Sequence, residues 1–292
     1  MTDTARSRYR DLQRLARAGG RPADELMTLY ALEGFLARLV TTRYRDTFVL
    51  KGGMLLAALD TRRPTRDIDV QALDFDNDIA HVLEVVRDVL AVDLDDGLTF
   101  DLGSVRVEQI RDDDDYHGVR VAIEAALATA RLKIKLDISV GDPITPRPEE
   151  VDVPRLLDGP PISMPGFPLP MVLAEKTVTA LERGTANTRW RDFADVLLLS
   201  RAHDVDGDEV ARAVAAVADH RGAELRPLAE VLDGFAEQAQ DRWWRWVRKV
   251  RLDDRLPEPF TEMLLAVQAF ADPVFAGDVA GRRWVAAEGR WR

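Results

Sequence analysis

The stretch FVLKGGMLLAALDTRRPTRDIDV, residues 48–70, decides how the rest of the chain is interpreted. It begins with an apolar run, continues into the glycine pair Gly52 and Gly53, and ends with Asp67 and Asp69 one residue apart. The last residues alternate polar and apolar side chains, which predicts a strand with both aspartates on one face. Glycines at a strand end and paired carboxylates are residue types that bind phosphates and metal ions.

Paired carboxylates on a strand are suited to divalent cations. Two of them at positions i and i+2 have Cβ atoms roughly 6 to 7 Å apart, a spacing that lets both bind one pair of ions. Oxygen ligands of this kind suit Mg²⁺, which completes its shell with substrate phosphates. Asp137 can supply a third carboxylate from another alternating segment, residues 132–138. Two Mg²⁺ ions held in this way can stabilise the attacking and leaving oxygens of a phosphoryl transfer.

The glycine pair fits the same chemistry. Without side chains, Gly52 and Gly53 let the backbone approach a triphosphate, and a helix expected over residues 54–59 would present N–H groups to its charge. Thr65 and Arg66 would close the other side of this cradle. Each motif alone is common, because polar faces of half-exposed strands are usually only solvated. Their combination favours a site.

Composition restricts the class of protein. The chain has 292 residues, of which 46% are hydrophobic and 31% charged, which is typical of globular proteins and long enough for two domains. It has no apolar run of about 18 residues and no secretory leader, so we expect a cytoplasmic protein without a membrane partner. The absence of cysteine excludes disulfides, thiolate nucleophiles and sulfur-ligated zinc. The four histidines are scattered, without metal-ligand spacing.

Charge restricts the partners. A net charge of −11 argues against coating nucleic acid by bulk charge, so any contact with nucleic acid must be a local patch. Of the 40 lysines and arginines only five are lysines, which leaves 35 arginines. Each lysine is therefore a better candidate than usual for a specific role. The five are Lys51, Lys133, Lys135, Lys176 and Lys249.

The order of periodic segments predicts an α/β (α+β) part with a mixed sheet, followed by an all-helical part. Helical periodicity spans residues 22–44 and 77–90, and strand-like alternation spans 105–110, 119–123 and 132–138. The buried stripe expected for the second helix consists of Ile79, Val82, Leu83, Val86 and Leu90. The acidic run Asp112 to Asp115 is interpreted as a solvated loop. Nine prolines between Pro143 and Pro170 indicate a boundary, and helices are expected at 170–183, 189–202, 207–220, 225–240, 241–252 and 258–271. We therefore expect domains at 1–160 and 161–292, with the active site in a groove completed by the helical domain.

Five motifs in order resemble those of a known family. They are FVLKGGMLLAAL, RPTRDIDV, KIKLDISVGDPI, PLPMVLAEKTVTAL and NTRWRDFADVLLL, and together they cover roughly residues 45–200. They are similar to the AbiEii family of toxins, including the MenT-type toxins, within the DNA polymerase β-like nucleotidyltransferase superfamily. The resemblance implies a nucleotidyltransferase domain and a Mg²⁺-dependent enzyme.

The resemblance also implies roles for single residues. Asp67 and Asp69 match the metal-binding carboxylates, and Asp137 matches the position of the third. Gly52 and Gly53 match the phosphate turn. Lys176 matches a lysine that contacts the triphosphate, and Asp192 matches the acidic residue of the last motif, a role that Asp195 could share. From its position alone, Lys176 lies within an apolar helical stripe, where an ammonium requires an anionic partner.

The segment DRWWRWVRKVR, residues 241–251, is the strongest candidate for contact with RNA. Arg242, Arg245 and Lys249 share one face of the predicted helix, and an exposed tryptophan beside them could stack on a base. The alternative is a packed amphipathic helix. Further basic and aromatic residues near the C-terminus could extend this patch: Arg282, Arg283, Trp284, Arg290, Trp291 and Arg292.

The combined expectation is a nucleotidyltransferase that transfers a nucleoside monophosphate from an NTP, with CTP as a candidate, and uses two Mg²⁺ ions. By resemblance, the acceptor is the 3′ end of tRNA, translation is blocked, and the chain is the toxin of a type IV toxin–antitoxin system with a cognate antitoxin protein. A monomer is expected. Two alternatives stay open: transfer to a small-molecule or protein hydroxyl, and a non-catalytic RNA- or partner-binding protein of the same fold.

Overall fold

The computed structural model describes residues 2–111 and 117–292, and the chain divides into two compact units. The first unit comprises Met1–Ala58, Arg62–Gly141 and Glu149–Gly166, and the second comprises Leu59–Thr61, Asp142–Pro148 and Phe167–Arg292. The acidic run expected to be a loop, Asp112 to Asp115, lies outside the described residues. No helix in the described ranges is long and apolar enough to cross a lipid bilayer.

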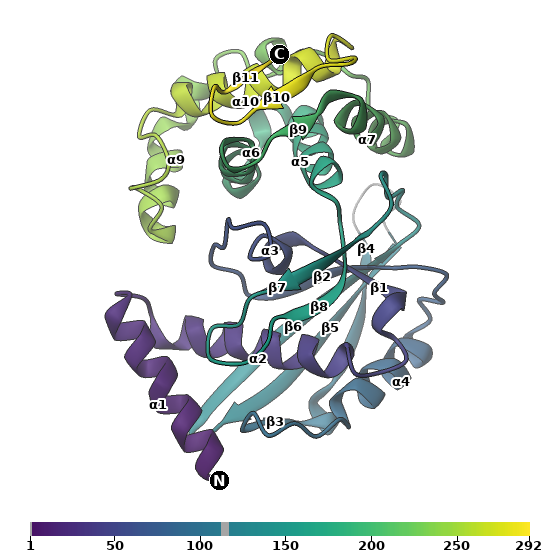
Figure 1. Ribbon diagram of the computed structural model, residues 1–292, viewed down its shortest axis with the longest axis vertical. Helices are drawn as coiled ribbons and strands as arrows, with labels where there is room; N and C mark the ends of the chain where they lie inside the picture. The colour runs from purple at the N-terminus through teal and green to yellow at the C-terminus, as the bar shows by residue number, and fades with distance from the viewer. Residues whose placement is uncertain (1, 112–116) are drawn as a thin grey trace. The chain divides into compact units, whose positions relative to one another are not determined.

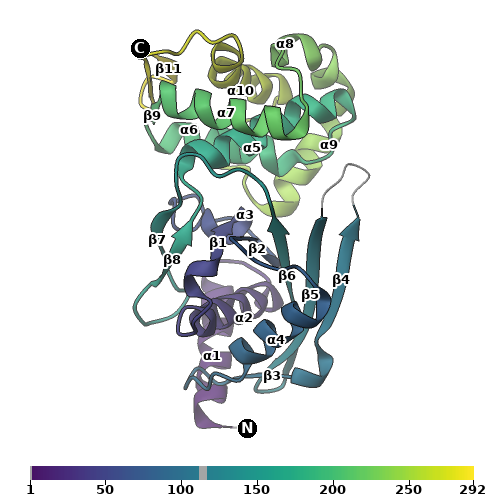
Figure 2. The same cartoon turned by 90° about the vertical axis from the view of Figure 1, so that its right-hand side faces the viewer.

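A mixed sheet forms the centre of the first unit. Its strands follow the order β3-β5-β6-β2-β1-β8-β7, and β4 pairs with β5 (Figures 1 and 2). The pairs β2–β6 and β1–β8 are parallel, and the other pairs are antiparallel. The mixed sheet expected from the sequence is thus confirmed. The strands are β1 (Phe48–Lys51), β2 (Asp67–Ala72), β3 (Leu98–Phe100), β4 (Arg106–Arg111), β5 (His117–Leu127), β6 (Ala130–Val140), β7 (Glu149–Val153) and β8 (Ile162–Gly166).

Helices cover one face of this sheet. Helix α2 lies against β6 (Figure 1), and its Phe35 and Leu39 pack with Val85 of α4 against Val70 and Leu136. Burial of each such side chain stabilises the fold by roughly 1.5 to 3 kcal/mol. The opposite face carries the polar members of the alternating strands. The helices of this unit are α1 (Asp3–Ala18), α2 (Ala23–Leu39), α3 (Gly52–Leu55) and α4 (Ile79–Leu90), with short 3-10 turns at Arg45–Thr47 and Leu102–Ser104.

Two helices of this unit differ from the expectation. Helix α3 is a single turn that begins at Gly52 and ends at Leu55, rather than a helix over residues 54–59. Helix α4 buries Val85 and Val89, whereas Ile79 is exposed. The reason is local: Asp78 caps the helix by accepting from the N–H groups of Ala80 and His81, which makes Ile79 the first helical residue.

The proline-rich segment is more ordered than a linker. It contains β7 and β8, which pair with each other and join the sheet through a parallel contact of Leu50 with Gly166. The carboxylate of Glu33 on α2 holds the loop between them, because it accepts from the N–H of Leu156 and pairs with Arg62. These two strands were missed by the sequence reading.

The second unit is mainly helical, but it is not all-helical as expected. It contains α5 (Leu169–Arg183), α6 (Trp190–Ala202), α7 (Gly207–Arg221), α8 (Leu228–Val231), α9 (Phe235–Val250) and α10 (Phe260–Phe275), with a 3-10 turn at Gly184–Ala186. A small sheet in the order β11-β10-β9 joins β9 (Val205–Asp206), β10 (Arg283–Val285) and β11 (Arg290–Trp291).

Aromatic packing explains why this unit folds without a large sheet. Phe193, Phe235 and Phe260 are buried and lie within 5.3 to 6.3 Å of one another, centroid to centroid. Trp190 stacks on Phe235, and Trp243 stacks on Phe260. The helices expected at 225–240 and 241–252 are in fact the short α8 and the continuous α9, which starts after Gly234 in a left-handed conformation.

Candidate active site

Strand β2 presents the two aspartates of the opening motif. Ile68 and Val70 are fully buried, so the alternation of the strand holds Asp67 and Asp69 on the opposite face. In the parallel register of β2 with β6, Asp69 lies opposite Asp137. One carboxylate oxygen from each of the three aspartates lies within 4.8 Å of the others. All three carboxylates are half-buried, and they form a compact group of oxygen donors.

The glycine turn lies directly beside this group. Strand β1 runs antiparallel to β2, with Lys51 opposite Asp69, and Gly52 follows with a φ of +65°. A Cβ atom on Gly52 would overlap the carboxylate of Asp69, and a Cβ on Gly53 would overlap the hydroxyl of Thr65. Both positions therefore require glycine. Since α3 is only one turn long, the open backbone of this turn, rather than a helix terminus, is the feature suited to a phosphate.

Thr65 and Arg66, the other residues expected to line the cradle, have different surroundings. The buried hydroxyl of Thr65 donates to Oδ1 of Asp67 at 2.9 Å. Thr65 thus orients one of the three carboxylates. Arg66 is exposed beside it.

Arg120 on β5 is a component of the site that the sequence reading missed. Its guanidinium donates twice to Asp137, from Nε at 2.8 Å and from Nη2 at 2.7 Å, in a bidentate pair. This contact is the largest cause of the raised pKa of Arg120, to which the charges of Asp67 and Asp69 also contribute. The arginine therefore orients the third carboxylate and balances part of the negative charge of the group.

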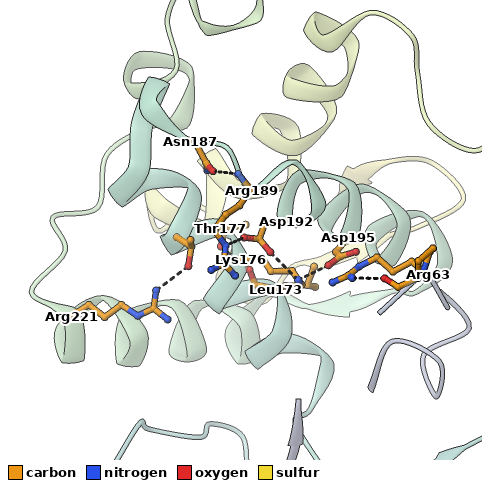
Figure 3. A network of polar contacts seen from close by, with 11 residues as sticks. Arg63, Leu173, Lys176, Thr177, Asn187, Arg189, Asp192, Asp195 and Arg221 are labelled. Carbon is orange, nitrogen blue, oxygen red and sulfur yellow. Dashed lines mark hydrogen bonds and ion pairs between the residues drawn. The ribbon is translucent and has the colours of Figure 1, made fainter. Parts of the chain in front are cut away.

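Lys176 and Asp192 lie in the second unit, where they form an ion cluster with Asp195 and Arg189 (Figure 3). Nζ of Lys176, on α5, is 2.6 Å from Oδ2 of Asp195 and 3.3 Å from Oδ1 of Asp192, both on α6. Nε of Arg189 is 2.5 Å from the other oxygen of Asp192. The anionic partner that a buried Lys176 requires is therefore supplied by the chain itself.

The charges of this cluster control the pKa of Asp192. Burial is the largest single influence and raises the pKa, but Lys176 and Arg189 together outweigh it and lower the pKa to about 2. Only 3% of the Asp192 side chain and 1% of the Asp195 side chain are exposed. Asp192 is thus held in its charged form.

The basic face expected on α9 is present, and of the three tryptophans of the segment Trp243 is buried whereas Trp244 and Trp246 are partly exposed. Arg242, Arg245 and Lys249 are exposed. Trp243 is fully buried and donates from Nε1 to the carbonyl of Pro257. Arg242 lies 5.8 Å from the ring of Trp190. The segment is an amphipathic helix that contributes Trp243 to the core and leaves its basic face exposed.

The prediction that the C-terminal tryptophans extend this patch by stacking on bases is wrong. Trp284 and Trp291 are buried, and their Nε1 atoms donate to the carbonyls of Ser200 and Phe270. Neither ring presents a free face to a base.

Three hard oxygen ligands on neighbouring strands, next to a turn that only glycine can form, match the chemistry of nucleotidyl transfer. The donor set also fits divalent metal ions, because Mg²⁺ prefers carboxylate oxygens and leaves positions for substrate phosphates. The class of protein that this fold and these residues define is a nucleotidyltransferase.

Comparison with known proteins gives the family. The model of the nucleotidyl transferase AbiEii toxin family, of type IV toxin–antitoxin systems, matches residues 34–272. The chain belongs to this family and is a nucleotidyltransferase, which confirms the resemblance drawn from the five motifs. No curated protein sequence matches the chain significantly.

One solved structure shows the same fold, and a second is reported for its similarity alone. A candidate nucleotidyltransferase from Helicobacter pylori has 16% sequence identity and a TM-score of 0.51, and the match covers 87% of this chain and 96% of that one. At this identity the likeness shows the fold alone. JHP933, also from Helicobacter pylori, has 14% identity and a TM-score of 0.48, with 96% of each chain covered.

Proposed function

We propose that this chain is a Mg²⁺-dependent toxin that transfers a nucleoside monophosphate from an NTP, with CTP as first candidate, to the 3′ end of tRNA. The observation that carries the proposal is the convergence of Asp67, Asp69 and Asp137 beside the Gly52–Gly53 turn. Family membership supports the toxin role and a cognate antitoxin. The modified tRNA would no longer accept an amino acid, so translation would stop in the cytoplasm.

The proposed reaction has a simple balance of bonds. The oxygen of the RNA 3′-terminal hydroxyl forms a bond to the α-phosphorus, the bond from that phosphorus to the bridging oxygen breaks, and pyrophosphate leaves. The hydroxyl proton passes to solvent. Asp67, Asp69 and Asp137 would hold divalent ions, whose charge would stabilise the entering and leaving oxygens.

The residues of the site have separate roles in this proposal. Asp67, Asp69 and Asp137 hold the metal ions. Thr65 fixes the carboxylate of Asp67 by its hydrogen bond, and Arg120 fixes that of Asp137. The backbone of the glycine turn accommodates the triphosphate.

Three further residues complete the nucleotide site that we propose. We assign Lys176 to a contact with the triphosphate and Asp192 to holding that lysine, as their ion pair allows. Arg66, exposed next to Asp67, is assigned a contact with the nucleotide. The protein is proposed to act as a monomer.

The test is incubation of the purified chain with labelled NTPs, Mg²⁺ and total bacterial tRNA. The wild type is expected to label tRNA at its 3′ end, and Asp69→Asn is expected to lose at least a hundredfold in rate, as expected when a ligand to a catalytic metal is lost. Asp74→Asn is the matched control, because Asp74 is an exposed aspartate just beyond β2 with a positive φ that asparagine tolerates.

Two results would contradict the proposal. A wild-type protein that labels nothing would exclude the transfer, and equal labelling by Asp69→Asn would exclude the role of the carboxylates. Label found on a small molecule or a protein instead of RNA would show that the acceptor is not tRNA.

A further inference from the structure

Two of the five lysines of the chain, Lys133 and Lys135, lie on β6 on the same face as Asp137, and neither has a role in the site described above. Arg131, Lys133 and Lys135 alternate with the buried residues Leu132 and Ile134, so the three cations point to the face that carries the aspartates. All three are exposed. Successive members are about 6.6 Å apart along the strand, a spacing similar to that of neighbouring phosphates on an extended RNA strand.

These cations are available to a ligand. Within residues 2–111 and 117–292, no carboxylate forms an ion pair with Arg131, Lys133 or Lys135. Glu124 lies opposite Lys133 in the β5–β6 register, yet no contact within salt-bridge distance joins them. On β5, the small residue Ala122 lies opposite Lys135 and flanks the row formed by Arg131, Lys133 and Lys135. Ala126 lies opposite Arg131, so small residues flank both ends of the row, with the exposed Glu124 between them.

The row leads to the carboxylates from the side opposite to the glycine turn. In the sheet, β2 lies between β1 and β6. The glycine turn follows β1, whereas Lys135 on β6 lies opposite Asp67. Lys133 and Arg131 continue away from the carboxylates along β6. An NTP at the glycine turn and an RNA strand on the row would thus meet at Asp67, Asp69 and Asp137 from opposite sides.

A shallow polar hollow borders the row. Lys133 and Arg106 line it together with Ser104 and two acidic residues, Asp101 and Glu124. Arg106 is exposed and adds a further cation on the same face, since it lies opposite Ala122 in the β4–β5 register. The strands β4, β5 and β6 run side by side here (Figure 2).

Charge complementarity selects the occupant. The chain has a net charge of −11, so it repels a polyanion over most of its surface. Three consecutive outward-facing cations that end at a group of metal-binding carboxylates form a local exception. A phosphodiester backbone matches both the sign and the linear arrangement of these charges.

We propose that Arg131, Lys133 and Lys135 form the docking surface for the phosphodiester backbone of the acceptor RNA strand, and that they direct its 3′ end to the three aspartates. This inference rests on the proposed function, because it concerns the acceptor of the same reaction. It assigns RNA binding to the open face of the sheet in the first unit, in addition to any contact by α9.

The test compares Arg131→Gln/Lys133→Gln with the control Arg17→Gln/Arg87→Gln. The first pair lies away from the carboxylates, and the control removes the same two charges from exposed positions on α1 and α4. Binding of a fluorescent single-stranded RNA is measured by anisotropy without NTP, over a range of salt concentrations. Transfer to total tRNA is measured in parallel, with the KM for the NTP as a second readout.

The first variant is expected to bind RNA about tenfold more weakly than the wild type, as estimated for two phosphate contacts. Its log–log dependence of affinity on salt should become shallower by about 1.4, because each contact with a single strand contributes about 0.7. Its KM for tRNA should rise by a similar factor, with the KM for the NTP unchanged. The control should behave as the wild type.

Other outcomes separate this inference from the proposed function. If the wild type transfers nucleotides to tRNA but the first variant keeps the RNA affinity and salt dependence of the control, the docking surface is wrong and the function stands. If the wild type labels no RNA but labels a small molecule or a protein, the acceptor is not RNA and the docking surface fails with it.

Discussion

At the scale of single residues, the site is decided by which side chains share one face of the sheet. The period of two in residues 67–70 is enough to place Asp67 and Asp69 together, because Ile68 and Val70 must be buried. Asp137 could be added from the same alternation on β6. Arg120 could not, since its contact depends on the antiparallel register that sets it opposite Asp137, and no local pattern reveals a register.

The need for glycine at position 52 gives a prediction at this scale. Gly52→Ala should reduce transfer by at least a hundredfold, because the added Cβ would displace the carboxylate of Asp69. Gly222→Ala is the matched control: its φ of +62° is close to the +65° of Gly52, but nothing lies within 4 Å of its Cβ position.

Both substitutions should lower stability by about 1 kcal/mol through the left-handed backbone alone. The measurement is kcat together with the unfolding temperature. Full activity of Gly52→Ala, or an equal loss of activity in both variants, would contradict the role of the turn.

At the scale of elements, α5 and α6 are joined by a buried ion cluster rather than by apolar contacts alone. The sequence placed Lys176 in an apolar stripe and required an anion beside it, and Asp192 was singled out only by resemblance. The structure unites the two, with Asp195 and Arg189. The pairing could not be read from either helix alone, because it depends on how the two helices pack.

This cluster predicts a dependence of stability on pH. The pKa of Asp192 is lowered from 3.8 to about 2 in the folded chain, so the charged form is favoured by folding. Its contribution, about 2 kcal/mol, is fully present above about pH 4 and is lost as the pH falls towards about 2.

Asp192→Asn should therefore have a lower unfolding temperature than the wild type at neutral pH, and the gap should narrow as the pH falls below about 4. Calorimetry at several pH values measures it. The control Asp253→Asn, at an exposed position, should show no such gap. A gap between Asp192→Asn and the wild type that is the same at every pH would contradict this account.

Strands β7 to β11 were not predicted from the sequence. Strands β7 and β8 were hidden by the prolines around them, although Val151, Val153, Ile162 and Met164 carry the alternation of a hairpin. Strands β9, β10 and β11 have two or three residues each and are too short for any period to appear. These short strands are held in place by the burial of Trp284 and Trp291, which depends on tertiary packing.

At the scale of the whole molecule, the residues of the proposed site are distributed over two compact units. The first unit contains the glycine turn, the three carboxylates and the basic row on β6, and the second contains the ion cluster of Lys176. The mixed sheet and the mainly helical nature of the second half followed from periodicity. Periodicity did not predict that residues 59–61 and 142–148, which are flanked in the sequence by residues of the first unit, belong to the second unit. Their assignment depends on packing, which no local pattern reveals.

The central claim is that Asp67, Asp69 and Asp137 hold the catalytic metal ions. The most direct measurement is an anomalous difference map from crystals grown with Mn²⁺ and a non-hydrolysable NTP analogue. The account predicts Mn²⁺ peaks bound by the carboxylates of Asp67 and Asp69, with the triphosphate against the Gly52–Gly53 turn. Manganese and nucleotide bound elsewhere, with these carboxylates contacting neither, would contradict it.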